Sequence, residues 1–150
     1  MKLLITGGKG MLGRTLQNEF KDCEIVIADL PEADITDAAG FDAFLAQNKP
    51  DAVIHCAAMT AVDKCESEIE FAYKLNAFGT ANVAAACNRH GVRLIAISTD
   101  YVFDGDSDRP YNEFDRANGG NTIYGKSKFA GEELSGEKWI SQINHTLCRS

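Results

Sequence analysis

The stretch ITGGKGMLGR, at residues 5–14, joins an apolar run to an amphipathic segment through a turn rich in glycine. Residues 2–6 (KLLIT) have the continuous apolar character of a short buried strand, and residues 11–20 repeat apolar side chains at the spacing of one helix face. A strand, a tight glycine turn and a helix in this order predict the first β-α unit of a doubly wound α/β domain.

The glycines of this turn follow the spacing G-x-x-G-x-x-G at Gly7, Gly10 and Gly13. Gly7 permits the tight turn, Gly10 lets the backbone approach a pyrophosphate, and Gly13 allows close packing of the helix on the strand. Phosphate oxygens would then lie on the free backbone N–H groups where the helix begins, at Met11 and Leu12. The turn therefore predicts a site for a dinucleotide.

The rest of the chain continues the alternation of strands and helices. Alternation of this kind implies parallel β-α-β units, and continuous apolar strands imply a sheet that is covered on both faces. We therefore expect an α/β fold with a doubly wound parallel sheet, Rossmann-like, with ligands at the carboxyl ends of its strands. The predicted strands cover residues 2–6, 24–28, 51–58, 92–98 and the start of one at 143–148, and the predicted helices cover 11–20, 41–48, 68–89 and 123–136, with a polar loop at 104–122.

The composition limits the possible partners and the compartment. The net charge of −7 argues against a nucleic acid polymer, whereas a dinucleotide can be held by backbone N–H groups. The number of cysteines is odd, at five, and no C-x-x-C spacing occurs, so we predict neither a disulfide framework nor a metal site. No apolar stretch reaches the ~20 residues of a membrane-spanning helix, and the first apolar run is too short for a signal peptide. We expect a cytoplasmic protein without membrane contact.

Acidic residues after the second predicted strand bear on the choice of dinucleotide. Asp29 ends that strand, where a carboxylate accepts hydrogen bonds from an adenosine ribose diol and disfavours a 2′-phosphate. Lys9 and Arg14 are close enough in sequence to offset this charge, so both NADH and NADPH stay open. Asp34 either reaches the adenine or lies in the N-cap region of the following helix.

Small residues follow the third predicted strand. Ala57 and Ala58 would let the backbone lie against a cofactor, and His55 at the strand end fits a buried, hydrogen-bonded histidine better than a catalytic one.

Four polar residues predict a catalytic site. Ser98 and Thr99 end the fourth strand, beside the expected ligand crevice. Tyr124 and Lys128 are four residues apart and share a helix face, so the ammonium is expected to lower the pKa of the phenol until it can pass a proton near neutral pH. A threonine hydroxyl can hold the same carbonyl oxygen. This set suits hydride transfer between a nicotinamide and a carbonyl or an alcohol.

The segments GGKGMLGR, ADITD, AAMTAVDKCESE, KLNAFGTANVA, STDYVFDG and YGKSKFAGE together resemble the extended short-chain dehydrogenase/reductase family, and within it the dTDP-4-dehydrorhamnose reductases. The resemblance runs through all 150 residues. It implies an oxidoreductase that uses NADPH or NADH to reduce the C4 keto group of dTDP-4-dehydro-L-rhamnose, giving dTDP-L-rhamnose.

The resemblance also implies roles for individual residues. Thr99, Tyr124 and Lys128 match the catalytic triad of the family, in which Tyr124 would protonate the sugar C4 oxygen and Lys128 would also hold the nicotinamide ribose. Asn76 matches a position near the cofactor, although a structural asparagine in the helix is a comparable alternative. Asp100 and Tyr101 would contact the dTDP-sugar, together with Thr99 and Tyr124.

Family members are roughly twice as long as this chain, and their second half supplies most of the sugar-nucleotide pocket. We therefore expect residues 1–150 to form the NAD(P)-binding Rossmann domain, truncated within its last strand, with the substrate-binding half absent. The Ala-rich helix at 68–89 is compatible with packing against a second copy in a homodimer or only against the sheet.

Two alternatives to the reductase stay open. A nucleotide-sugar epimerase or dehydratase shares the scaffold, but dehydratases usually carry Asp-Glu after the threonine, where this chain has Asp100 and Tyr101. A non-catalytic cofactor-binding relative, such as the regulatory β subunit of methionine adenosyltransferase, is the other.

Overall fold

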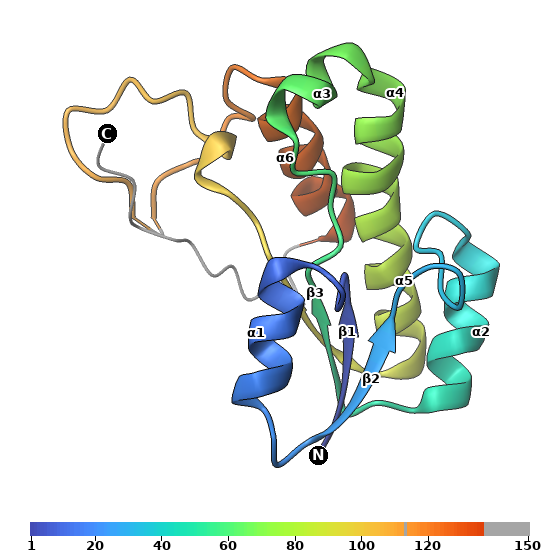
Figure 1. The fold of residues 1–150 in the computed structure, drawn as a ribbon. Coiled ribbons are helices and arrows are strands. Elements are labelled where there is room, and N and C mark those ends of the chain that lie inside the picture. The colour runs from blue at the N-terminus through green and yellow to red at the C-terminus, as the bar shows by residue number, and fades with distance from the viewer. Residues whose placement is uncertain (113, 137–150) are drawn as a thin grey trace.

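The computed structural model describes residues 1–112 and 114–136. Within this part the chain forms a four-stranded parallel sheet in the order β2-β1-β3-β4, with helices on both faces (Figure 1). The predicted doubly wound α/β fold is therefore confirmed. The strand predicted at 143–148 and the predicted truncation of the domain lie outside the described residues.

The strands form where the sequence is continuously apolar. β1 (Lys2–Thr6) and β2 (Glu24–Ala28) have the predicted bounds, whereas β3 (Ala52–His55) and β4 (Arg93–Ala96) are shorter than predicted. After His55 and Ala96 the chain leaves the sheet, and the residues that follow line a cavity at the carboxyl ends of the strands. The predicted third and fourth strands were therefore too long, because they included the segments after His55 and Ala96 that line the cavity.

The long Ala-rich helix consists of three parts that follow one another directly. These parts are α4 (Ile69–Ala72), a π-helical segment η1 (Tyr73–Gly79) and α5 (Thr80–His90). The helix ends at Gly91, which takes the left-handed conformation with φ 66°. The predicted helix at 68–89 is confirmed, but its π-helical middle was not predicted.

The other helices largely agree with the predictions. α2 (Ala38–Asn48) begins earlier than predicted because Asp37 caps it, with its Oδ1 accepting the N–H of Gly40 at 3.1 Å. Two short elements were not predicted, α3 (Val62–Ser67) and the 3₁₀ turn η2 (Asp100–Val102). The remaining two are α1 (Met11–Glu19) and α6 (Ile123–Ser135). Among the described residues, no helix is both long and apolar enough to cross a membrane.

Alternate side chains of the strands point to opposite faces of the sheet, and each face has its own core. α1 covers one face, with Leu16 and Phe20 packed against the side of β1 that carries Leu3 and Ile5. On the other face the buried cluster joins β1 and β3 to α2 and α5, through Leu4, Val53, Phe41, Leu45 and Val83. Figure 1 shows α1 on one side of the sheet and α2 with the long helix on the other.

α6 packs against η1 and α5, and Gly131 allows this close approach. A Cβ added at Gly131 would meet the carbonyl oxygen of Asn76, which already accepts a hydrogen bond from the Thr80 hydroxyl at 2.7 Å. The contact is between two backbones, so neither side can move away as a side chain could.

Replacing Gly131 with alanine should therefore lower the free energy of unfolding by about 1–3 kcal/mol, the usual cost of overpacking. Helix propensity alone would act in the opposite direction by about 1 kcal/mol. Urea unfolding followed by circular dichroism measures the effect. The comparison is Gly40→Ala in α2, where the added Cβ would meet the capping carboxylate of Asp37, a side chain that can turn aside at no more than the cost of its cap, about 1 kcal/mol. An unchanged stability in Gly131→Ala would contradict the close contact.

Candidate functional site

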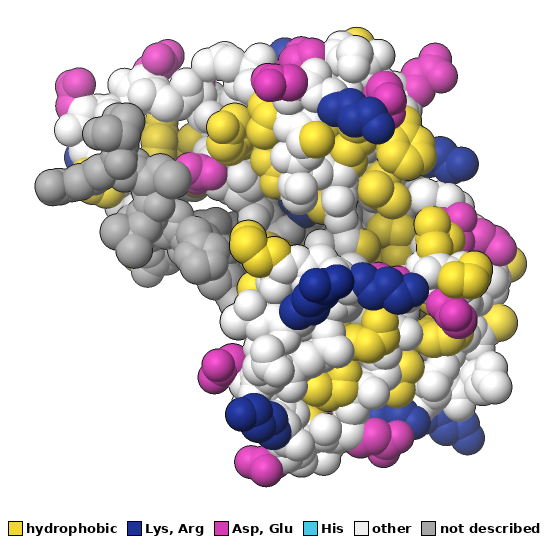
Figure 2. Space-filling view, in the orientation of Figure 1, with side chains coloured by type: hydrophobic (Ala, Val, Ile, Leu, Met, Phe, Trp, Pro, Cys, Tyr) yellow, Lys and Arg dark blue, Asp and Glu magenta, His cyan; other side chains and the backbone are white. Residues whose placement is uncertain are grey.

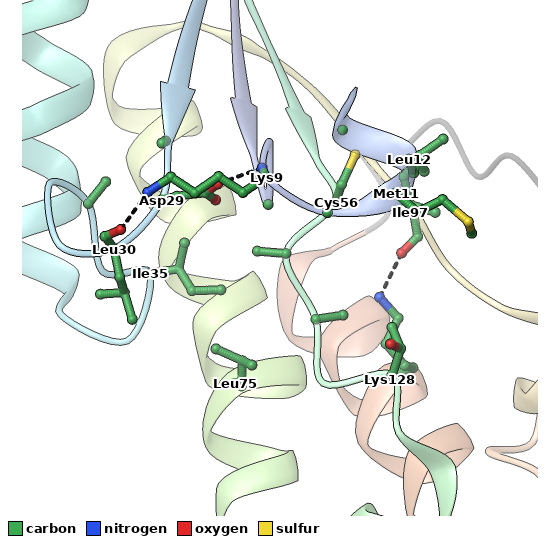
Figure 3. Close-up of a pocket in the computed structure, with 18 of the residues that line it drawn as sticks. Lys9, Met11, Leu12, Asp29, Leu30, Ile35, Cys56, Leu75, Ile97 and Lys128 are labelled. Carbon is green, nitrogen blue, oxygen red and sulfur yellow. Dashed lines mark hydrogen bonds between the residues drawn. The ribbon is translucent and has the colours of Figure 1, made fainter. Parts of the chain in front are cut away.

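A cavity of about 570 Å³ lies at the carboxyl ends of the strands, a volume in the range that holds a cofactor. Figure 3 shows its two ends, with Lys9, Asp29 and Leu30 at one and Cys56, Ile97 and Lys128 at the other. Tyr124 and Ser98 also line it. Every predicted cofactor residue except Asn76 belongs to the lining, namely Gly7, Gly10, Met11, Leu12, Gly13, Asp29, Asp34, Ala57, Ala58 and Lys128.

The glycine turn forms the wall between these two ends. Gly7 has φ 67°, and a Cβ there would come within 2.7 Å of the Ala57 backbone nitrogen, so the turn lies directly against the segment that follows β3. α1 begins after Gly10 with no side-chain cap and no acidic residue in its first turn. The N–H groups at Met11 and Leu12 are thus available to an anion, and the backbone around Gly10 leaves room for one. These features fit the pyrophosphate of a dinucleotide.

Asp29 holds the glycine turn from the end of β2. Its Oδ2 accepts the N–H of Lys9 at 2.7 Å and its Oδ1 accepts the N–H of Gly8 at 3.2 Å. Each carboxylate oxygen keeps a further lone pair for a ribose hydroxyl. Lys9 donates from Nζ to the carbonyl of Leu30 at 2.8 Å and so places a cation beside the carboxylate. Figure 2 shows basic side chains across the middle of this face of the molecule, near the start of α1.

Asp34 lines the cavity at the same end but does not cap a helix. Its Oδ1 accepts both the N–H and the hydroxyl of Thr36 at 2.8 Å, and these hydrogen bonds lower the pKa of the carboxyl group. The N-cap of α2 is Asp37. The contact of Asp34 with the adenine of a dinucleotide stays a prediction.

Lys128 is buried at the opposite end, with 6% of its surface exposed. Its Nζ donates to the carbonyl of Ile97 at 2.6 Å (Figure 3). Burial lowers the pKa of the ammonium to about 8, and the charge of Glu132 is the largest influence in the opposite direction. Ile97 is the ammonium's hydrogen-bond partner among residues 1–112 and 114–136, so further N–H donors are available to a ligand.

Tyr124 is half-buried, and its ring packs edge-on against Tyr101 with the centroids 5.5 Å apart. Burial raises the pKa of the phenol, and the influence of the Thr99 hydroxyl only partly opposes this effect. The predicted lowering of the pKa by Lys128 was therefore wrong for this state of the protein. The physical reason is that loss of hydration disfavours the phenolate, while the ammonium of Lys128 is directed to the Ile97 carbonyl.

The residues after β4 lie in two different surroundings. Ser98 lines the cavity, and its hydroxyl donates to the Glu132 carboxylate. Thr99 caps η2, accepting the N–H of Tyr101 at 3.3 Å and donating to the Asp100 carboxylate at 3.2 Å. Asp100 and Tyr101 are exposed, next to Tyr124 but outside the lining of the cavity.

His55 belongs to a buried chain of hydrogen bonds that the sequence did not reveal. The Thr80 hydroxyl donates to the Asn76 carbonyl, so it must accept from His55 Nε2–H, at 3.0 Å. His55 Nδ1 then carries no proton and accepts from the Thr6 hydroxyl at 2.6 Å. The expectation of a buried, hydrogen-bonded histidine is confirmed, and its ring is neutral.

Asn76 extends this chain toward α6. Its side-chain amide accepts the N–H of Met59 at 2.8 Å and donates to the Met59 carbonyl at 3.1 Å and to Ser127 Oγ at 3.0 Å. The side chain is 1% exposed and does not line the cavity. These contacts favour the structural alternative for Asn76, in which it joins the segment after β3 to α6. Asn76 lies in the π-helical segment, which the periodicity of the sequence did not indicate.

Comparison with known proteins gives consistent matches along the chain. The model of the family described as RmlD substrate binding domain matches residues 1–148. A dTDP-4-dehydrorhamnose reductase of Streptomyces griseus is 42% identical over 131 residues, which cover 86% of this chain and 43% of the relative. The chain thus spans about half the length of the curated relatives it matches.

Two solved structures have the same fold. The dTDP-4-dehydrorhamnose reductase of Clostridium acetobutylicum aligns with a TM-score of 0.86 and 46% identity, covering 90% of this chain and 49% of that one. The enzyme of the same name from Bacillus anthracis, solved in complex with NADP, aligns with a TM-score of 0.87 and 39% identity, covering 95% and 53%.

The buried state of His55 predicts a dependence of stability on pH. Burial and the nearby charge of Lys128 lower the pKa of His55 to about 3 from 6.5. Below pH 6.5 the unfolded chain binds a proton that the folded chain does not, so stability is present above that pH and is lost as pH falls toward 3.

We expect the His55 contribution to lower the free energy of unfolding by about 1.4 kcal/mol per pH unit below the ordinary histidine pKa. Urea titrations between pH 5 and 7.5 should show a shallower pH dependence in His55→Gln than in the unmodified protein. His90→Gln, a change at the surface, should keep the His55 contribution. Identical slopes in the unmodified protein and His55→Gln would contradict a neutral buried ring.

Proposed function

We propose, since this chain belongs to the family described as RmlD substrate binding domain, that it forms the NAD(P)-binding part of a dTDP-4-dehydrorhamnose reductase. The observation that carries the proposal is that the glycine turn and the pair Tyr124–Lys128 line one cavity. A dinucleotide held on the turn would therefore share the cavity with a proton donor. The Bacillus anthracis relative in complex with NADP supports a nicotinamide dinucleotide as the ligand.

The residues at the two ends of the cavity would bind different parts of the dinucleotide. The N–H groups of Met11 and Leu12 would hold the pyrophosphate, and the carboxylate of Asp29 would accept from the adenosine ribose. Lys128 would donate to the nicotinamide ribose at the opposite end. When bound, NADPH or NADH supplies the hydride that the C4 carbon of the sugar receives.

Tyr124 would donate a proton to the C4 oxygen of the sugar. The phenol is protonated at neutral pH and can therefore act as an acid, although its raised pKa makes it a weaker acid than an ordinary tyrosine. Lys128, with a pKa of about 8, is mostly charged at pH 7 and would stabilise the phenolate that remains. The Thr99 hydroxyl, which lowers the pKa of the phenol and so lies near it, would hold the same oxygen.

The substrate in this proposal is dTDP-4-dehydro-L-rhamnose and the product is dTDP-L-rhamnose. Asp100 and Tyr101 are exposed beside Tyr124, where a sugar that approaches the phenol would contact them. Two negative charges on the nucleotide part of the substrate would need partners beyond these residues, since Asp100 is itself acidic.

Tyr124→Phe in the complete gene product should lower kcat/KM for the dTDP-4-dehydro sugar by at least about 100-fold, because the acid is lost while the ring remains. NADPH affinity, measured by fluorescence, should change little. Tyr73→Phe, in η1, is the matched control.

Near-normal reduction by Tyr124→Phe would contradict the role of proton donor. If the unmodified complete protein binds NADPH but never oxidises it with the dTDP-4-dehydro sugar, the non-catalytic alternative replaces the reductase.

A second prediction concerns the choice between the two dinucleotides. Lys9 places its charge beside Asp29, where a 2′-phosphate would lie. Lys9→Met should weaken NADPH relative to NADH by about fivefold, the size expected for one exposed charge pair. The ratio of dissociation constants from fluorescence titrations measures this, with Lys21→Met as the control at the opposite end of α1. An unchanged ratio in Lys9→Met would rule out a contact between Lys9 and the phosphate.

A further inference from the structure

Glu132 lies one helical turn beyond Lys128 on α6 and has no part in the chemistry described above. Its carboxylate accepts a hydrogen bond from the Ser98 hydroxyl, and Ser98 lines the cavity just beyond the end of β4. A serine and a glutamate that are far apart in the sequence thus join α6 to the carboxyl end of a central strand. The contact lies at the end of the cavity that holds Lys128.

Two consecutive residues of the strand end hold two consecutive turns of α6. The carbonyl of Ile97 accepts from Lys128 Nζ at 2.6 Å, and the hydroxyl of Ser98 donates to Glu132. Figure 3 shows the hydrogen bond between the Ile97 carbonyl and the Lys128 side chain. The ammonium and the carboxylate are therefore fixed relative to the same two residues of the backbone.

Charge explains why this arrangement matters for Lys128. Burial favours the neutral amine and lowers the pKa of Lys128 to about 8, while Glu132 is the largest influence in the opposite direction. Burial also raises the pKa of the Glu132 carboxyl, but the Ser98 hydrogen bond and the Lys128 charge oppose this and favour the carboxylate. Ser98 therefore stabilises the charged form of the group that stabilises the ammonium.

The other titratable groups near Lys128 do not supply a negative charge at neutral pH. Burial raises the pKa of the Cys56 thiol, at the end of β3, to about 11, so it is neutral. His55, on β3, is neutral because its pKa is lowered to about 3. Tyr124, on α6 itself, is protonated because its pKa is raised. Among the residues that the structure describes, Glu132 is the anion that acts on Lys128.

We propose that Glu132, held in place by Ser98, is a positioning residue that keeps Lys128 charged and directed into the cavity. The inference rests on the proposed function, because Lys128 is there assigned to the nicotinamide ribose and to the phenolate of Tyr124. Its electrostatic part concerns the protein alone and can be measured without sugar or cofactor.

The decisive experiment follows the Lys128 ammonium by NMR in protein labelled with ¹³C,¹⁵N-lysine, titrated from pH 6 to 11. Glu132→Gln removes the charge and keeps an oxygen that accepts from Ser98. We expect the Lys128 titration midpoint to fall by about one unit, as for loss of a nearby opposite charge. Glu133→Gln, an exposed neighbour on the same helix, should leave the midpoint in place. An unchanged midpoint in Glu132→Gln overturns the proposal.

Ser98→Ala is a second variant that keeps the carboxylate and releases it from the strand end. It should shift the Lys128 midpoint in the same direction by a smaller amount. If Glu132→Gln loses its fold by circular dichroism, this variant decides, and an unchanged midpoint in Ser98→Ala overturns the proposal.

The complete gene product gives a separate readout in its pH profiles. In Glu132→Gln, NADPH affinity and kcat/KM should be near normal at pH 6.5, where Lys128 is charged either way, and should fall by about tenfold relative to the unmodified protein at pH 8.5. A uniform loss at all pH values would instead indicate a structural role only and would overturn the proposal. Failure of sugar reduction in the unmodified protein would remove the proposed function but would leave the NMR result intact.

Discussion

The geometry of the cavity depends on a chain of buried hydrogen bonds that begins at Thr6 and passes through His55 and Thr80 to Asn76. Each member has one arrangement of donors and acceptors that satisfies its neighbours, and the neutral ring of His55 is the central link. In the described part of the chain, no buried side-chain nitrogen or oxygen lacks a partner. Removing one member would leave its neighbours unsatisfied in an apolar core, which costs more than a single hydrogen bond contributes.

This series of hydrogen bonds connects the glycine turn, which would bind the cofactor, to α6, which carries Tyr124 and Lys128. At one end Thr6 precedes the glycine turn, and its hydroxyl also accepts the N–H of Ala57 at 3.2 Å. At the other end Asn76 donates to Ser127, whose hydroxyl donates to the carbonyl of Tyr124 at 2.9 Å. The wall that would hold a pyrophosphate and the helix that carries the proton donor are thus positioned by one polar network. A cavity built in this way has its shape before any ligand arrives.

The sequence predicted what depends on local pattern and missed what depends on distant contacts. The bounds of β1 and β2 follow from continuous apolar runs, and the end of the long helix follows from Gly91. Asn76, within the π-helical segment, hydrogen bonds Met59 and Ser127, and such distant partners cannot be read from helical spacing. The prediction for the pKa of Tyr124 failed for a related reason, since the spacing to Lys128 indicates a shared helix face but not the burial that raises the pKa.

The chain has a net charge of −7, yet two lysines line the cavity beside its two aspartates, Asp29 and Asp34. Both lysines that line it are tethered to backbone carbonyls just beyond strand ends, Lys9 to Leu30 after β2 and Lys128 to Ile97 after β4. A carbonyl holds an ammonium through its dipole and leaves the positive charge in place. A carboxylate in direct contact would cancel that charge. Lys9 is exposed, so its field is screened, whereas Lys128 is buried and acts at full strength only while it stays protonated. Each lysine has a carboxylate close by, Asp29 at the exposed end and Glu132 at the buried end, and Glu132 acts to keep Lys128 charged.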